Sequence, residues 1–283
     1  MKKNNSVVFG LTSNHVFAVA CVMMDLKRFC KSIIDEIVIF HDGINEKDKR
    51  LLTTIMPCRF IIYDFPLKNT SNFDQTTLNY FSKMVFSKFE CFRLLDDYCN
   101  VVWLDYDIVI QQDISELFEP SKSGIQMIRS GTIVRDQLSA DVDDYDMTAL
   151  GITASTFSVH QNLPNYRDKY AFCYKILPKY AQYLRLPEQA IIDFMLQEFE
   201  NPIETLDVNI YSPHPKDLLH TPSAKIVHAY GQPKFWNGIN NIQWNRNYTA
   251  WIEMGGTKYR ELNIAEKIFR KLKRLILNRS KSN

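Results

Sequence analysis

Four short apolar runs decide the fold class of this chain: VVFGL at residues 7–11, IVIF at 37–40, FIIY at 60–63 and VVWL at 101–104. Stretches with helical spacing separate these runs, and the longest of them covers residues 76–97. Strands that are apolar throughout and alternate with helices are typical of a mostly parallel sheet covered on both faces. The sequence therefore predicts a Rossmann-like α/β domain, in which ligands bind beyond the carboxyl ends of the strands.

The second half of the chain is less regular. Its expected elements are a strand, two helices and a last short strand, at residues 151–159, 166–183, 187–199 and 225–227. Pro187, with Glu188 beside it, is typical of the first turn of a helix. No repeat or linker divides the chain before about residue 258. We therefore predict a single domain over residues 1–258.

Residues 259–283 are predicted to form a basic C-terminal tail. Between residues 265 and 283 there are seven Lys or Arg and one Glu, which gives a net charge of +6, and apolar residues recur with helical spacing. Such a basic amphipathic helix fits an anionic membrane surface. It also fits a terminal helix packed on the body of the protein with a solvated basic face. The expected location is cytoplasmic and peripheral, on the cytoplasmic face of the membrane.

Composition excludes several classes of protein. The 34 Lys and Arg against 32 Asp and Glu give a net charge of +2, so no nucleic-acid partner is expected. The longest apolar run, residues 16–24, is far shorter than the roughly 20 residues of a membrane-spanning helix, and no signal peptide is predicted. The six cysteines contain no Cys-x-x-Cys pair and are interpreted as reduced thiols.

Two carboxylates follow directly after the strand predicted at residues 101–104. Asp105 and Asp107 are two residues apart, so their side chains point the same way if the chain remains extended. Because neighbouring carboxylates repel each other, a cation is needed to hold them together, and their hard oxygens suit Mg²⁺ or Mn²⁺. The pair also fits two polar residues of a strand-end turn. We interpret Asp105 and Asp107 as a metal site.

A second cluster, HAYGQPKFW at residues 228–236, follows the last predicted strand. His228 at the strand end could supply a nitrogen ligand, which would favour Mn²⁺ over Mg²⁺. Lys234 could meet a phosphate as a point charge. Taken alone, His228 also fits a hydrogen-bonded residue of the strand.

Together, the two clusters resemble the motifs of glycosyltransferase family 8, the retaining enzymes that include lipopolysaccharide galactosyl- and glucosyltransferases and glycogenin. LDYD at residues 104–107 matches the family's L-D-x-D, and HAYGQPKFW matches its H-x-x-G-x-x-K-P-W except at Phe235. The resemblance extends over about residues 7–236. It implies a GT-A fold and a hexose that is transferred from UDP-galactose or UDP-glucose to a glycan hydroxyl. The implied acceptor is lipopolysaccharide, lipooligosaccharide or another cell-surface polysaccharide, free or lipid-linked.

The resemblance also implies roles for individual residues. Asp105, Asp107 and His228 would hold Mn²⁺, with Mg²⁺ as the alternative, and the metal would bridge the donor diphosphate. That diphosphate would also contact Gly231 and Lys234. The implied catalytic residues are Asp105, Glu188 and Gln189. Further donor-binding residues implied by the resemblance are Thr12, Asn14, His15, Lys88, Tyr106, Thr153 and Ala154.

Several positions depart from the family pattern. Thr12 and Ser13 replace a commonly acidic pair, and His15 stands where an aromatic residue usually lies against uracil. Lys88 stands where the family generally has Arg, which keeps the charge but loses the bidentate fork. Residues 153–155 (TAS) replace a usual Asn-Ala-Gly. Because these changes lie around the sugar and nucleoside rather than the metal, the resemblance indicates the donor class more firmly than the sugar.

Three other functions fit parts of the sequence. DYDIV at residues 105–109 fits the nucleophile motif of haloacid-dehalogenase-type phosphatases, which normally lies on the first strand and requires a later acidic pair at another strand end. Sugar-phosphate nucleotidyltransferases require a Gly-rich loop after the first strand, and GLTSN at residues 10–14 is not one. A catalytically inactive nucleotide-sugar-binding or scaffold protein is the third alternative, because Thr12, Ser13 and Thr153 differ from the family pattern.

Overall fold

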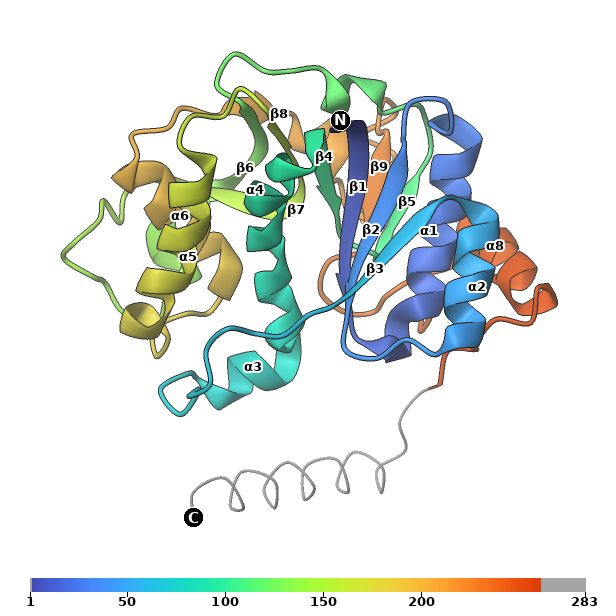
Figure 1. Cartoon of the computed structure of the whole chain (residues 1–283), viewed down its shortest axis with the longest axis horizontal. Coiled ribbons are helices and arrows are strands. Elements are labelled where there is room, and N and C mark those ends of the chain that lie inside the picture. Colours follow the sequence, from blue (N-terminus) through green and yellow to red (C-terminus); the bar gives the residue numbers. More distant parts are fainter. Residues whose placement is uncertain (1, 261–283) are drawn as a thin grey trace.

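A seven-stranded sheet forms the centre of the computed structural model, which describes residues 2–260 (Figure 1). The four apolar runs form its first four strands, β1 (Lys3–Leu11), β2 (Glu36–His41), β3 (Cys58–Ile62) and β4 (Tyr98–Leu104). These strands pair in parallel in the order β3-β2-β1-β4. The parallel pairing predicted from the alternation of strands and helices is confirmed.

Three further strands extend the sheet beyond β4, in the order β7 (Leu150–His160), β6 (Ile125–Ile133) and β8 (Glu204–Leu206). β7 is antiparallel to both β4 and β6, whereas β8 is parallel to β6. The sheet is therefore mostly parallel with one reversed strand. β6 was not predicted because its second half, RSGTI, is polar and its pairing with β7 is interrupted by register shifts.

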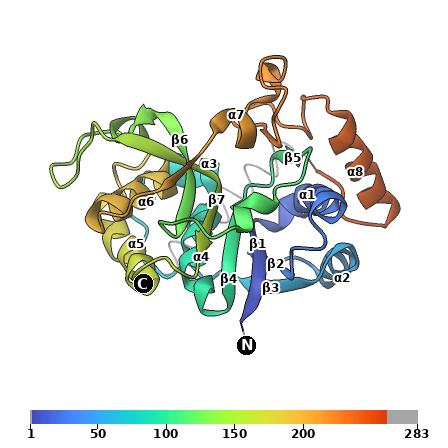
Figure 2. The same ribbon diagram turned by 90° about the horizontal axis from the view of Figure 1, so that it is seen from above.

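Helices cover both faces of the sheet (Figures 1 and 2). Alternate residues of β1 enter different cores, since Val7 and Phe9 pack with one set of helices and Val8 with the other. The first core contains α1 (Val16–Phe29), α2 (Glu46–Ile55), α7 (Val208–Tyr211) and α8 (Ile242–Glu253). The second contains α5 (Tyr166–Tyr180) and α6 (Pro187–Glu198). Because the two cores share one sheet, residues 2–260 form a single domain.

The prediction of one continuous helix over residues 76–97 is wrong. The segment divides into α3 (Gln75–Phe81), a 3₁₀ segment (Lys83–Phe89) and α4 (Glu90–Arg93). Ser82 separates the first two with a φ of 61°, a backbone conformation that few residues with a side chain adopt, and its hydroxyl accepts the N–H of Met84. The break lets the 3₁₀ segment pack closely on β1, where a Cβ at Gly10 would lie 2.0 Å from the Ser87 hydroxyl.

A two-stranded ribbon lies beside the main sheet and consists of β5 (Ile108–Ile110) and β9 (Ile226–His228). The two strands are antiparallel, with Ile108 opposite His228. The backbone N–H of Ala229 donates to the carbonyl of Asp107 at 2.9 Å. The ribbon therefore places the two motifs of the sequence next to each other.

Three predictions concern the C-terminal tail, membrane-spanning helices and the cysteines. Most of the predicted tail, residues 261–283, lies outside the described residues. Among residues 2–260, no helix is long and apolar enough to cross a bilayer. All six cysteines are free thiols, as the absence of paired spacing predicts.

Candidate functional site

A pocket of about 1320 Å³ opens at the carboxyl ends of β1 and β4. Its walls come from both halves of the chain: the turn after β4, the start of α6, the end of β9 and the loops that follow β1 and α7. This is the edge of the sheet at which ligands are expected in α/β folds. Its volume exceeds the roughly 300–1,000 Å³ of most small-molecule pockets, so it has room for a large ligand or for two.

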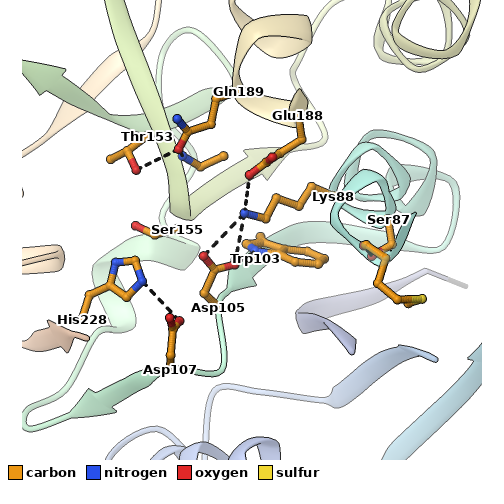
Figure 3. A network of polar contacts seen from close by, with 12 residues as sticks. Ser87, Lys88, Trp103, Asp105, Asp107, Thr153, Ser155, Glu188, Gln189 and His228 are labelled. Atoms are coloured by element: carbon orange, nitrogen blue, oxygen red, sulfur yellow. Dashed lines mark hydrogen bonds and ion pairs between the residues drawn. The ribbon is translucent and has the colours of Figure 1, made fainter. Parts of the chain in front are cut away.

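Asp105, Asp107 and His228 converge in this pocket (Figure 3). One carboxylate oxygen from each aspartate and one ring nitrogen of His228 all lie within 4.8 Å of one another. The chain does not remain extended at the two aspartates, because it turns there between β4 and β5, and the pairing of β5 with β9 brings in the histidine. Among residues 2–260, no other set of three or more His, Cys, Asp or Glu side chains is close enough to share a metal ion. Two oxygens and one nitrogen fit a divalent cation such as Mn²⁺ or Mg²⁺.

Asp107 lies among cationic groups. His228 Nε2 is 3.2 Å from Asp107 Oδ1, and the ammonium of Lys234 forms an ion pair with Oδ2 while donating to the carbonyl of Ala229 at 2.8 Å. Burial alone would raise the pKa of Asp107, but His228 and Lys234 outweigh burial and hold the pKa well below its usual range. On the far side of the ring, His228 Nδ1 lies 3.0 Å from the hydroxyl of Ser212, which orients the imidazole.

Asp105 is fixed from the main sheet. The indole N–H of Trp103 donates to Asp105 Oδ1 at 2.8 Å, and Lys88 Nζ lies 3.2 Å from the same oxygen. Lys88 also forms an ion pair with Glu188 at 2.8 Å. Burial acts to lower the pKa of Lys88, but the two carboxylates outweigh it and raise the pKa above its usual value. A charged Lys88 therefore connects the end of β4 with the start of α6.

Gln189 lies in the first turn of α6 and faces β7 (Figure 3). Its Oε1 accepts the hydroxyl of Thr153 and the backbone N–H of Ala154, both at 3.1 Å. One turn further along α6, Asp193 accepts the N–H of Ile152 at 3.0 Å. Burial raises the pKa of Asp193 to about 6. These contacts fix α6 against β7 beside the pocket.

An aromatic cluster lines another part of the pocket. The rings of His15 and Tyr106 are stacked with centroids 5.0 Å apart, and Trp236 lies 5.8 Å from His15. Thr12 Oγ1 is 3.0 Å from His15 Nδ1. Burial lowers the pKa of His15 to about 4, so the ring is neutral at neutral pH. Asn14 is exposed and lies outside the lining of the pocket.

Gly231 contributes open backbone to the pocket. Its φ of +71° lies in the left-handed region that favours glycine, and no atom comes within 4 Å of the place where a Cβ would be. The backbone is therefore accessible to a ligand in the pocket that Lys234 also lines.

Sequence reasoning missed three residues of the site. Trp103 is the last aromatic residue of a buried strand and is expected in a core, so nothing in its sequence context indicates that it binds Asp105. Ser212 lies outside both motifs and carries no sequence signal. Trp236 ends the second motif and received no role there, although it completes the cluster with His15.

Comparisons with known proteins give a family match for part of the chain and solved structures with a similar fold. Residues 6–128 match the family described as Glycosyl transferase family 8, and this match includes Asp105 and Asp107 but ends before His228. No curated protein matches the chain. The apo structure of the bifunctional glycosyltransferase WbbM is similar to 90% of the chain at 14% identity, with a TM-score of 0.64. The chain spans only about half of that protein, 51% of its length.

Two other solved structures are similar over most of their own length. The galactosyltransferase LgtC, in complex with donor and acceptor sugar analogs, matches 91% of this chain and 98% of its own at 12% identity, with a TM-score of 0.62. The apo form of mouse xyloside xylosyltransferase 1 matches 82% of this chain and 100% of its own at 15% identity, with a TM-score of 0.52. At such identities the similarity shows a shared fold. The resemblance to glycosyl transferase family 8 is therefore confirmed, by a family match over residues 6–128 and by a GT-A-like fold over about nine-tenths of the chain.

Proposed function

We propose that this chain is a retaining, metal-dependent glycosyltransferase that moves galactose or glucose from a UDP-sugar to a hydroxyl of a glycan acceptor. The observation that carries the proposal is the convergence of Asp105, Asp107 and His228 in one large pocket. The family match and the shared fold support the class of reaction. The structure of LgtC holds donor and acceptor sugar analogs, and we infer that this pocket takes ligands of the same two kinds.

Asp105, Asp107 and His228 would hold the metal, and their mixed oxygen and nitrogen donors favour Mn²⁺ over Mg²⁺. When bound, the metal supplies positive charge opposite the negative charge that grows on the donor diphosphate as its bond to the sugar breaks.

The chain supplies further positive charge and backbone donors for the diphosphate. Lys234 is placed by its bond to the carbonyl of Ala229, three residues after the turn at Gly231. Its ammonium is therefore fixed before the ligand arrives, which is the condition under which a point charge stabilises a leaving group most effectively. At the aromatic part of the pocket, the neutral ring of His15 stacked on Tyr106 gives a planar surface for the base, with Thr12 beside it.

Glu188 and Gln189 are placed to contact the transferred sugar. One oxygen of Glu188 binds Lys88, while Oε2 is buried with no hydrogen-bond partner among residues 2–260, so it can accept a sugar hydroxyl. Gln189 is fixed on β7 by Thr153 and Ala154. An amide does not act as a base at neutral pH, so Gln189 orients or stabilises the sugar. Retention then follows if the acceptor hydroxyl attacks on the face that the diphosphate leaves, with the leaving phosphate accepting its proton.

The acceptor is proposed to lie at an anionic membrane surface on the cytoplasmic side. Tyr259, close to the end of the described residues, lines the pocket, and the predicted basic tail of residues 259–283 begins with it. A net charge of +6 between residues 265 and 283 would attract the chain to anionic lipid. Sedimentation of the full chain with anionic but not with neutral vesicles is expected, and equal sedimentation with both would contradict this placement.

The test of the function is a panel of nucleotide sugars incubated with the full chain and Mn²⁺, without acceptor. We expect slow Mn²⁺-dependent release of UDP from UDP-galactose or UDP-glucose, and its loss in Asp105→Ala. Asp143→Ala is the matched control, because it removes an exposed aspartate of another Asp-x-Asp pair outside the pocket. Turnover retained by Asp105→Ala would overturn the metal site. Tight binding without release by the unaltered chain would favour the inactive scaffold.

A further inference from the structure

The last described residues form a segment that no motif covers. This C-terminal strap, residues 255–260, follows α8 and is the last coloured part of the chain in Figure 1. Thr257 attaches it to α2, since its backbone N–H and its hydroxyl donate to the two oxygens of Asp48 at 3.0 and 2.6 Å. The indole of Trp251 donates to the carbonyl of Thr257 at 2.9 Å. The strap is therefore bound to α2 and α8 at once.

Close packing fixes the path of the strap. Gly256 lies directly on the buried ring of Trp251, and a Cβ at this position would be 2.0 Å from that ring. Asp48 is itself fully buried and is bound by the Asn45 side chain at 2.6 Å. Both attachment points thus belong to the core, so the residues that follow them start from a fixed position.

Tyr259 carries the strap to the pocket. Its backbone N–H donates to the hydroxyl of Tyr248 at 3.0 Å, and its ring packs on Phe17 and Trp236 with centroids 5.4 and 6.4 Å away. Trp236 in turn lies 5.8 Å from His15. Tyr259 lines the same pocket as the stacked His15 and Tyr106 and is half-buried.

We propose that Tyr259 is a further nucleoside-binding residue, whose ring closes the aromatic end of the donor site and is held there by the clamp between Thr257 and Asp48. The assignment rests on the proposed function, which places the base of the donor at His15 and Tyr106. A planar base gains most from aromatic surfaces that border it on more than one side. Tyr259 extends the aromatic surface of His15 and Trp236 from a segment more than 240 residues away from His15 in the sequence.

The test compares two ligands of the full chain in the presence of Mn²⁺, UDP and inorganic pyrophosphate, by isothermal titration calorimetry. Pyrophosphate reaches the metal and Lys234 but has no base. We expect Tyr259→Ala to weaken UDP binding by about 3- to 10-fold and to leave pyrophosphate binding unchanged, as the loss of one aromatic contact predicts. Tyr259→Phe should restore UDP binding. Lys258→Ala, an exposed neighbour on the same strap, is the matched control and should bind both ligands normally.

A second variant tests the clamp. Asp48 lies outside the pocket lining. Asp48→Ala should nevertheless weaken UDP binding, as Tyr259→Ala does, because it releases Thr257. A thermal melting curve measured for each variant confirms that the variant is folded. Normal UDP binding by Tyr259→Ala, or an equal loss for UDP and pyrophosphate, would overturn the assignment. If the unaltered chain binds neither ligand with Mn²⁺, the proposed function fails first and the assignment falls with it.

Discussion

The two aspartates of the candidate metal site are held by different parts of the molecule. Asp105 is fixed from the main sheet, by the indole of Trp103 and the ammonium of Lys88. Asp107 is fixed from the β5–β9 ribbon, by His228 and Lys234. Each aspartate thus has one lysine partner, but the two lysines have different surroundings.

Burial differs between the two sides. The side chains of Lys88 and Glu188 are 6% and 5% exposed, whereas those of Lys234 and Asp107 are both 13% exposed. Lys88 binds two carboxylates, and its removal leaves both without a cation, whereas removal of Lys234 still leaves His228 beside Asp107. We therefore expect the sheet side to contribute more to stability than the ribbon side.

The largest effect is expected from Lys88→Met. It leaves Asp105 and Glu188 without their cation, and breaking a buried pair costs about 3–5 kcal/mol of unfolding free energy. Lys234→Met should cost less than Lys88→Met, because His228 still faces Asp107. Both should lower donor hydrolysis by roughly 10²- to 10³-fold. Urea unfolding and Mn²⁺-dependent UDP release measure the two quantities.

Lys88→Arg is the control for this pair of variants, because it keeps the charge between the two carboxylates and should keep most of the stability. If Lys88→Met and Lys234→Met lower the unfolding free energy by the same amount, the sheet side does not contribute more to stability than the ribbon side.

The difference between the two sides also explains what could be predicted from the sequence. The strand before Asp105 is apolar throughout and alternates with helices, so its place in a parallel sheet follows from pattern alone. The ribbon has two strands of three residues, too short for any period, and its partners are separated by more than a hundred residues. Its strand-end position made His228 a candidate nitrogen ligand, and the resemblance to a family joined it to Asp105 and Asp107. No signal indicated that Ser212 would orient the ring.

A second expected effect lies on the sheet side and concerns Asp193, which holds β7 against α6. Its folded pKa of about 6 lies above the unfolded value of 3.8, so its stabilising contribution is present below about pH 4 and is lost as the pH rises through 6. Two pKa units correspond to at most about 3 kcal/mol. Asp193→Asn keeps an oxygen for the N–H of Ile152 and removes the charge.

We therefore expect the melting temperature of Asp193→Asn to rise relative to that of the unaltered chain as the pH increases from 4 to 7. Asp143→Asn, an exposed control, should show no such trend. Parallel stability curves for Asp193→Asn and the unaltered chain would mean that the carboxyl group titrates at the same pH in the folded and unfolded states.

The smallest effect is expected from Ser212→Ala on the ribbon side. The hydroxyl lies 3.0 Å from His228 Nδ1 and 3.2 Å from the hydroxyl of Ser155, so its loss frees the imidazole without opening the core. Mn²⁺ affinity should fall about 10-fold, as for other residues that orient a metal ligand, with a stability change under about 1 kcal/mol. Titration of Mn²⁺ followed by electron paramagnetic resonance measures the affinity.

Ser155→Ala is the matched control, because it removes the hydroxyl beyond Ser212 but leaves the contact between Ser212 and His228 in place. It should bind Mn²⁺ more tightly than Ser212→Ala does. If both variants bind Mn²⁺ like the unaltered chain, the pairing of β9 with β5 is sufficient to orient His228. The ribbon side would then differ from the sheet side, where the side chains of Trp103 and Lys88 bind the aspartate directly.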